Sequence, residues 1–286
     1  MNMKRVLVIG GTGNIGSKVI AQLTTAGTHV RAMVRNPDTA AMPPQVEVFG
    51  GDLTLPNTLH TCLQDTDAVF LVWTAPAEAA ASALNLITSQ VKRIVYLSAP
   101  IHTPHPFFQA SLPNPMSVLH EEIEGLIRNS GIEYTFLRPG MLASNAIHWW
   151  APQIRKSDLV RWPYLDAFTA PIDEADIASV AVCTLLQNGH AGSDYILTGP
   201  QSLSQFEQIS IIGHTIGRKL KIEEILPEEA QRNWNTSWPA FIRNMLLKSW
   251  AAAVGKPAYV SNAVAEVTGT PARSYFVWAS GHAQLF

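Results

Sequence analysis

The stretch Val6-Leu-Val-Ile-Gly-Gly-Thr-Gly-Asn-Ile-Gly16 decides the fold of this chain. Four apolar residues lead into a Gly-x-x-Gly-x-x-Gly pattern, and an apolar-patterned segment continues to Leu23. This order predicts a buried strand, a tight turn and the start of a helix. Bare glycines let a pyrophosphate approach the backbone, where the amides and the dipole of a helix N-terminus favour negative charge. The stretch therefore predicts a dinucleotide site, although such glycines can also serve only the turn of an α/β protein.

The composition is that of a globular protein with a large core. The chain has 286 residues, 47% of them hydrophobic and 15% charged, with a net charge of −2. No basic excess points to nucleic acid. Cys62 and Cys183 lack metal-ligand spacing, so we expect ordinary thiols and no metal site. No apolar run approaches the ~18 residues that cross a bilayer, and the run after Met1–Arg5 is too short for a signal peptide. We expect a cytoplasmic protein without membrane contact.

Short apolar segments alternate with helical patterns through the first half. The apolar, often β-branched segments predict strands buried on both faces: Arg5–Ile9, Thr28–Val34, Val46–Gly50, Ala68–Val72, Arg93–Ser98 and Tyr134–Arg138. Helical patterns lie between them: Ile15–Thr25, Thr58–Leu63, Ala77–Gln90 and Met116–Ser130. This alternation predicts an α/β fold of Rossmann type, a doubly wound parallel sheet with helices on both faces.

The end of the second predicted strand bears on the choice of cofactor. NAD-binding folds usually place an acid there, on the ribose 2′-hydroxyl. Here the strand ends in Val34-Arg-Asn-Pro37, without an acid. Arg35 could pair with a 2′-phosphate through its planar guanidinium, or lie solvated at a strand end, and Arg31 is a weaker second candidate. We therefore predict NADP(H) rather than NAD(H).

The second half is less regular. Helices are predicted at Ile172–Leu186, at Ser204–Ile216 and, broken near Pro239, at Pro227–Val254, with a short strand at Tyr195–Thr198. We expect a single NAD(P)-binding Rossmann domain over residues 1–286. A small α+β substrate lobe, drawn mainly from about 141–170 and 195–286, would lie over the carboxyl edge of the sheet.

Short motifs spread over nearly the whole chain keep a specific order and spacing. They are Gly10-Gly-Thr-Gly-Asn-Ile-Gly16, Val34-Arg-Asn-Pro37, Gly51-Asp-Leu53, Gly131-Ile-Glu-Tyr-Thr135, Leu137-Arg-Pro-Gly140, Pro171-Ile-Asp-Glu-Ala-Asp-Ile-Ala178, Tyr195-Ile-Leu-Thr-Gly199 and Val267-Thr-Gly-Thr-Pro271, the last before a terminal helix. Together they resemble the NmrA-like group of atypical short-chain dehydrogenases/reductases. That group includes NADPH-dependent quinone reductases, isoflavone-type and ergot-alkaloid-type reductases, and redox-sensing regulators without known turnover.

The resemblance implies roles for individual residues. The cofactor contacts that it implies are Gly10, Thr12, Gly13, Asn14, Ile15 and Gly16 along the dinucleotide, Arg35 at the 2′-phosphate, Asp52 and Leu53 beside adenine, and Thr74 near the nicotinamide ribose. Ser98, which ends the fifth predicted strand, falls near the position of the short-chain reductase serine. We include Ser98 among the site residues, although it could simply end the strand.

The catalytic pair of ordinary short-chain reductases is missing. Those enzymes use Tyr-x-x-x-Lys, in which the tyrosine donates a proton and the lysine lowers its pKa. By the family's spacing from Gly131, His120 stands where the lysine would be, and Met116 where the tyrosine would be. His120 is our candidate acid, although it could equally be a helix-face histidine, and Glu124 one turn later could orient it. Reduction of a quinone or enone needs less help, because its oxyanion is delocalised and water or one histidine can supply the proton.

Aromatic residues gather where a substrate should bind. The segment 99–115 and the residues after the sixth predicted strand belong to the carboxyl edge of the sheet, where ligands bind in this architecture. We expect an aromatic-walled pocket for a flat or greasy ligand. Its candidate residues are Phe107, Phe108, Met141, Asn145, Trp149, Trp162 and Trp234. Each tryptophan could instead pack the core of the lobe.

Three functions are compatible with these patterns. The first is an NADPH-dependent reductase of a small planar or hydrophobic electrophile, with a quinone or enone as the first choice of substrate. The second is a non-catalytic NADP(H)-sensing protein that binds a partner. The third is a non-redox cyclase or isomerase on the same scaffold. The sequence fixes neither the substrate nor the oligomeric state.

Overall fold

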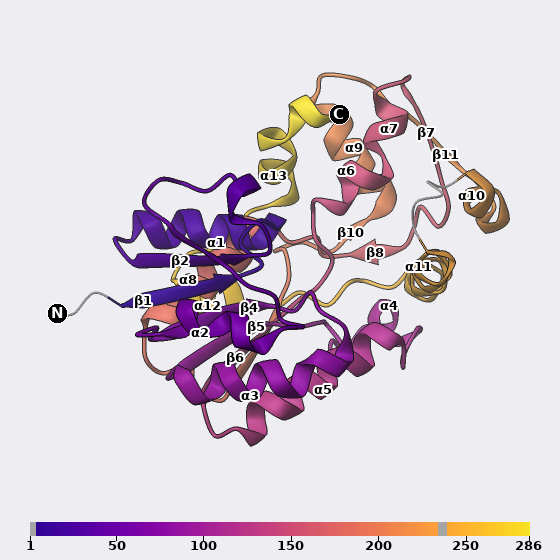
Figure 1. Ribbon diagram of the computed structural model, residues 1–286. Coiled ribbons are helices and arrows are strands. Elements are labelled where there is room, and N and C mark those ends of the chain that lie inside the picture. Colours follow the sequence, from indigo (N-terminus) through magenta and orange to yellow (C-terminus); the bar gives the residue numbers. More distant parts are fainter. Residues whose placement is uncertain (1–3, 234–238) are drawn as a thin grey trace.

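A seven-stranded parallel sheet forms the centre of the computed structural model, which describes residues 4–233 and 239–286 (Figure 1). Its strands follow the order β3-β2-β1-β4-β5-β6-β9. They are β1 (Arg5–Ile9), β2 (His29–Val34), β3 (Glu47–Gly50), β4 (Ala68–Val72), β5 (Arg93–Leu97), β6 (Glu133–Pro139) and β9 (Ser193–Leu197). The strand order reverses between β1 and β4, which is the point where open α/β sheets bind ligands. The predicted fold class is confirmed.

Helices cover both faces of the sheet, as a parallel sheet buried on both sides requires (Figure 1). One face carries α1 (Asn14–Thr25), α8 (Glu174–Leu186) and α12 (Ala263–Thr268), and the other carries α2 (His60–Leu63), α3 (Ala80–Gln90) and α5 (Pro115–Asn129). Strand β1 shows why both layers form. Val6 and Val8 pack into the first layer, whereas Leu7 and Ile9 pack into the second, because side chains alternate along a strand.

A smaller lobe lies beyond the carboxyl ends of the strands. Its helices are α4 (Pro106–Gln109), α6 (Asn145–Trp149), α7 (Ala151–Ile154), α9 (Gln205–Thr215), α10 (Pro227–Asn233), α11 (Ala240–Ala253) and α13 (Tyr275–Gly281). Its strands are β7 (Leu159–Trp162), β8 (Phe168–Thr169), β10 (Leu203–Ser204) and β11 (Lys221–Glu224), which pair as β11-β7 and β10-β8. Single 3₁₀ turns lie at Pro37–Thr39, Pro56–Leu59, Ala77–Ala79 and Ala283–Leu285. The core of the lobe is a cluster of buried aromatic and aliphatic side chains.

The last third of the chain contributes to both parts of the molecule. Strand β9 pairs with β6 in the central sheet, and α12 packs on α8. The range 195–286, expected mainly in the lobe, is therefore shared between the lobe and the sheet. No helix within the described ranges is both long enough and apolar enough to cross a membrane.

Candidate functional site

The three glycines of the opening stretch differ in what the fold asks of them. Gly10 has a φ of +87°, and a Cβ there would lie 2.7 Å from Cβ of Val72. A Cβ on Gly16 would lie 2.2 Å from the carbonyl oxygen of Gly10. Gly13 has a φ of −79°, and its Cβ would meet only that same oxygen, at 3.3 Å. The turn and the packing therefore require glycine at Gly10 and Gly16. Packing does not strongly require glycine at Gly13, where the missing side chain leaves the backbone accessible to a ligand.

The N-terminus of α1 is open to an anion. Its N-cap residue, Gly13, offers no side chain to the first amides, and no acidic side chain stands in the first turn. The first amides of a helix have no intrahelical acceptor, and the helix dipole adds positive potential there. A helix start left uncapped beside a bare glycine fits a pyrophosphate.

A cleft of about 210 Å³ collects residues from the carboxyl ends of four neighbouring strands. Predicted cofactor residues line it: Gly10 and Thr12 after β1, Arg35 after β2, Asp52 and Leu53 after β3, and Thr74 after β4. Asn14 and Gly13 lie on the adjoining turn, whereas the side chain of Ile15 is buried in the core between α1 and the sheet. The cleft is lined from the ends of four neighbouring strands, which suits an extended dinucleotide.

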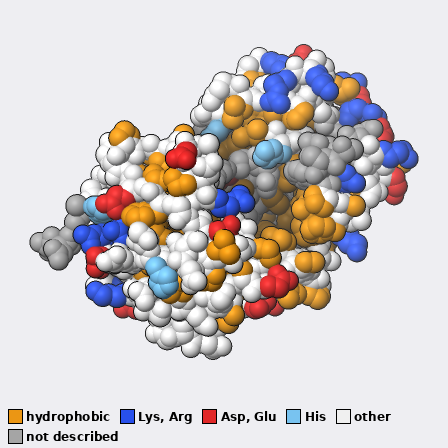
Figure 2. All heavy atoms as spheres, in the orientation of Figure 1, with side chains coloured by type: hydrophobic (Ala, Val, Ile, Leu, Met, Phe, Trp, Pro, Cys, Tyr) orange, Lys and Arg blue, Asp and Glu red, His pale blue; other side chains and the backbone are white. Residues whose placement is uncertain are grey.

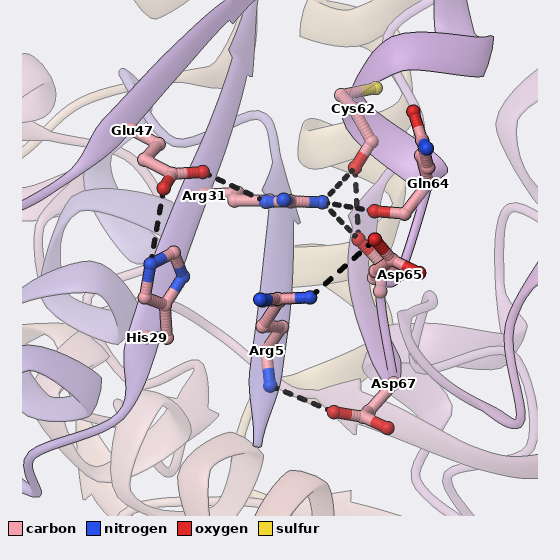
Figure 3. Close-up of polar contacts among 9 residues, drawn as sticks. Arg5, His29, Arg31, Glu47, Cys62, Gln64, Asp65 and Asp67 are labelled. Carbon is pink, nitrogen blue, oxygen red and sulfur yellow. Dashed lines mark hydrogen bonds and ion pairs between the residues drawn. The ribbon is translucent and has the colours of Figure 1, made fainter. Parts of the chain in front are cut away.

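Arg31 lies within β2 and Arg35 directly follows it, and their environments differ. Arg35 is exposed, and within residues 4–233 and 239–286 it makes no ion pair or hydrogen bond. Arg31 is engaged, because its Nε lies 3.0 Å from a Glu47 carboxylate oxygen and its guanidinium reaches the carbonyl oxygens of Cys62 and Gln64 (Figure 3). Arg31 ties β2 to β3 and to the end of α2. Arg35 is therefore the arginine available to a ligand.

Asp52 presents a fixed carboxylate in the same cleft. The backbone amide and the hydroxyl of Thr54 both donate to it, each at 2.8 Å. These hydrogen bonds lower the pKa of Asp52, and the positive charge of Arg35 acts in the same direction. A carboxylate that stays ionised is an acceptor for an exocyclic amine such as that of adenine.

His120 contacts a buried tyrosine. Its Nδ1 lies 2.5 Å from the hydroxyl of Tyr96 on β5, and among the described residues it lines neither the cofactor cleft nor the apolar cavity described below. Burial lowers the pKa of His120 and raises that of Tyr96. These shifts favour the neutral forms of both groups, so the contact joins a neutral imidazole to a neutral hydroxyl. The expected orienting role of Glu124 is not seen in the structure, because that carboxylate is bound elsewhere.

Glu124 is the centre of a buried ionic network. Arg138 of β6 donates to it from Nε and Nη2, at 3.0 and 2.7 Å, and Ser98 donates its hydroxyl proton at 2.6 Å. Arg128, one turn along α5, and Asp194 of β9 extend the network. Burial alone would raise the pKa of Glu124, but the hydrogen bonds from Arg138 and Ser98 lower it.

Sequence reasoning missed Arg138 and Tyr96. The one sequence signal for Arg138 was its place as a cation inside an apolar strand pattern. A buried cation requires a partner of opposite charge, but the pattern does not identify that partner. The network also fixes Ser98. The Ser98 hydroxyl donates its hydrogen bond to Glu124, so toward a ligand it can only accept a hydrogen bond.

An apolar cavity of about 250 Å³ adjoins the sheet edge after β5 and β6. Predicted substrate residues line it: Phe107, Phe108, Met141 and Asn145. Met245, Leu246 and Ser249 of α11 line it from the lobe. Figure 2 shows this face hollowed between the two parts of the molecule, with hydrophobic side chains gathered along the hollow. Cofactor cleft and apolar cavity thus follow one another along the carboxyl edge of one sheet.

The predicted tryptophans have a different place. Trp149 and Trp162 are buried in the lobe core, with ring centroids 6.1 Å apart, and Trp149 meets Trp250 at 5.2 Å. Neither Trp149 nor Trp162 lines the apolar cavity in the part of the chain that the structure describes. Trp234 lies outside the described residues. The described part also holds no group of His, Cys, Asp and Glu side chains arranged to bind a metal.

Comparisons with known proteins agree with this geometry. The model of a family described as NAD(P)H-binding matches residues 10–188. The chain is 33% identical to a (4-alkanoyl-5-oxo-2,5-dihydrofuran-3-yl)methyl phosphate reductase of Streptomyces griseus, over 98% of this chain and 99% of that protein. It is 30% identical to an NAD(P)H azoreductase of Xenophilus azovorans, over 98% and 99% of the two chains. The structure of Citrobacter triphenylmethane reductase complexed with NADP(H) shares the fold, with a TM-score of 0.81 at 20% identity over 98% and 99%. The chain therefore belongs to the NmrA-like family of NAD(P)H-binding oxidoreductases.

Proposed function

We propose that this protein is an NADPH-dependent reductase of a small, planar or hydrophobic electrophile, with quinones and conjugated enones as the first candidates. The observation that carries the proposal is the succession of two cavities along one sheet edge. The first is polar and lies at an uncapped helix N-terminus, and the second is apolar. NADPH, when bound, supplies a hydride. The protein contributes the alignment of that donor with an electrophile and the exclusion of water.

The proposed cofactor contacts follow from the cleft. The amides after Gly13 would hold the pyrophosphate, and Asp52 and Leu53 would border adenine. Arg35 would pair with the 2′-phosphate, because it is exposed at the end of β2 and its guanidinium makes no hydrogen bond or ion pair with another described residue. Thr74 stands on the side of the cleft toward β5 and would meet the nicotinamide ribose.

In this proposal solvent supplies the proton. His120 was the sequence candidate, but its Nδ1 is held by Tyr96 and its lowered pKa keeps the ring neutral at pH 7. A neutral imidazole is a weak acid. Ser98 cannot donate to a substrate either, because its hydroxyl already donates its hydrogen bond to the Glu124 carboxylate. An electrophile whose reduced form is already delocalised needs no strong acid, which favours quinones and enones over simple ketones.

The names of the two relatives support the class of chemistry. One is a reductase of a dihydrofuranone phosphate and the other an azoreductase, and both names describe conjugated acceptors. The group that the chain resembles also includes redox-sensing regulators without known turnover. The absence of a Tyr-x-x-x-Lys pair favours this second candidate, a non-catalytic NADP(H) sensor. The proposed reductase would act on a small molecule in the cytoplasm.

The test is NADPH consumption over a panel of quinones, enones, azo dyes, imines and simple ketones. We expect turnover of quinones or enones, and little or none of simple ketones. NADPH binding without turnover of any compound would refute the reductase and favour a sensor, above all if a partner binds one redox form selectively. Conversion of a compound that is unchanged by omitting NADP(H) would favour the cyclase or isomerase.

A further inference from the structure

Within the described ranges, no charged side chain lines the apolar cavity. Its wall consists of aliphatic and aromatic side chains, serines, asparagines, a glycine and a proline. The residues outside those ranges, 1–3 and 234–238, have no charged side chain in the sequence either. A groove that shares Asn114 with this cavity does include an ionisable group, Glu122, but its charge is negative. An ionised group inside the cavity would therefore lose its hydration without meeting a counter-charge.

The polar side chains of the cavity wall are neutral and bind neighbouring atoms. Ser111 donates to the carbonyl oxygen of Met245 at 3.1 Å, and its hydroxyl lies 3.1 Å from that of Ser249. Asn145 donates to the sulfur of Met141 at 2.9 Å. Such groups suit a neutral polar atom of a ligand, but they do not replace the hydration shell of a full charge.

Two of the helices that begin at the carboxyl edge of the sheet differ at their N-termini. Helix α1 begins uncapped at Gly13, beside the cofactor cleft. Helix α5 begins beside the apolar cavity, and its N-cap side chain, Asn114, accepts from the amides of Met116 and Ser117 at 3.0 Å each. The first residue of α5, Pro115, has no amide hydrogen. The start of α5 therefore presents no free amide to an anion, whereas the start of α1 does.

We propose that the apolar cavity selects uncharged acceptors and rejects those that carry a phosphate, sulfonate or carboxylate group. This inference rests on the proposed reductase function and adds the charge of the substrate to it. The edge of the sheet thus separates its two ligands by charge. The uncapped start of α1 takes the anionic cofactor, and the capped start of α5 borders the site of a neutral acceptor. The Streptomyces griseus relative is named for a phosphate substrate, and this cavity offers such a group no cation among the described residues.

Met116 is the position at which this selection can be weakened. Its side chain lines the cavity and is 49% exposed, so a lysine there can remain solvated while it brings a cation to the rim. Val118 lies two residues further along α5, is 52% exposed and belongs to the groove with Glu122 rather than to the described lining of the cavity. Val118→Lys adds the same charge to the same helix and is the matched control for Met116→Lys.

The first test measures binding without turnover. Naphthalene-2-sulfonamide and naphthalene-2-sulfonate have nearly the same size, and only the sulfonate is ionised at neutral pH. Their Kd values are measured by calorimetry on protein saturated with NADPH, which neither compound oxidises and which keeps the anion out of the cofactor cleft. We expect wild type to bind the sulfonate roughly 100-fold more weakly than the sulfonamide. Met116→Lys should reduce this ratio about fivefold, and Val118→Lys should leave it unchanged.

The second test measures turnover of 1,4-naphthoquinone and of 1,4-naphthoquinone-2-sulfonate. The sulfonate lies on the quinone ring, so that ring cannot enter the cavity without the charge. Because a sulfonate withdraws electrons, intrinsic reactivity alone would make the charged quinone the faster substrate. We expect the opposite order, with kcat/KM roughly tenfold lower for the sulfonate in wild type.

Three results would overturn the proposed selection by charge. The first is a wild type that binds the sulfonate within about threefold of the sulfonamide. The second is a wild type that does not bind the sulfonamide. The third is the same ratio in Met116→Lys and Val118→Lys when thermal unfolding shows both variants to be folded. Absence of quinone turnover alongside the expected binding ratio would count against the proposed reductase function alone, because binding of the naphthalene compounds involves no hydride transfer.

Discussion

Replacing Arg35 by alanine should abolish the preference for NADPH over NADH. Arg35 is exposed and unpaired within the described ranges, so its interaction with a 2′-phosphate takes place close to the dielectric constant of water. Two unit charges 4 Å apart then gain about 1 kcal/mol, and a phosphate carries nearly two charges. The expected contribution is about 2 kcal/mol, which corresponds to roughly a 30-fold change in Kd. NADH has no 2′-phosphate, so its affinity should hardly change.

The assay is an equilibrium titration of each variant with NADPH and with NADH. Arg31→Ala is the matched control, because it removes an arginine from the same region of β2. That variant should unfold at lower temperature, since it removes the ion pair with Glu47 and the hydrogen bonds to the carbonyl oxygens of Cys62 and Gln64, but its ratio of NADPH to NADH affinity should stay that of wild type. The reasoning would be refuted if Arg35→Ala kept the wild-type ratio, or if Arg31→Ala lost it.

Three further predictions concern the turn and the buried groups. Gly16→Ala should lower the melting temperature, because its Cβ would lie 2.2 Å from the Gly10 carbonyl oxygen, whereas Gly13→Ala should mainly weaken NADPH binding; thermal unfolding and titration separate the two. Glu124→Gln removes the buried carboxylate that binds Arg138, so that Arg138 keeps only the partly exposed Asp194 as a charged partner, and should lower the free energy of unfolding by about 3 kcal/mol at pH 7. The pKa of Glu124 is lowered in the folded state, so the stability that its charge contributes is complete above its ordinary pKa of 4.5 and is lost as the pH falls below that value. The free energy of unfolding, measured by denaturation below about pH 5, should therefore depend less on pH in the variant than in wild type. His120→Ala should keep kcat and its pH dependence between about pH 6 and pH 8, and a 100-fold loss would restore that histidine as the acid.

The sheet was predictable because its strands are apolar runs bounded by turn residues. Segments such as Arg5–Ile9 and Ala68–Val72 match the observed strands. The strands of the lobe were not predicted, because runs of two to four residues such as β8 and β7 carry no periodicity of their own. Their existence depends on which distant segment lies beside them.

The candidate site divides in the same way. Residues that follow parallel strands of one sheet, such as Arg35 and Thr74, lie at the same edge of that sheet. The role of Glu124 depends on contacts across elements. The spacing of Glu124 from His120 suggested that the two side chains pair on one helix. Arg138 on β6 binds the Glu124 carboxylate instead, because its guanidinium carries a full charge and donates two hydrogen bonds in bidentate geometry. Likewise, Trp149 and Trp162 follow the sixth strand in the sequence, which suggested that they lie at the carboxyl edge of the sheet. Only the packing of the lobe shows that they face the core of the lobe.

The hydrogen bond from Ser98 to Glu124 has a consequence for substrate choice. Enzymes that polarise a carbonyl with several donors can level the intrinsic differences between substrates. Here the hydroxyl of Ser98 donates its hydrogen bond to the buried carboxylate of Glu124 and is not available to polarise a carbonyl. The intrinsic reactivity of the acceptor then has more weight in the rate. Within a series of quinones of one shape, electron-withdrawing substituents should raise the rate steeply, so that the protein selects acceptors by their electron affinity as well as by their fit.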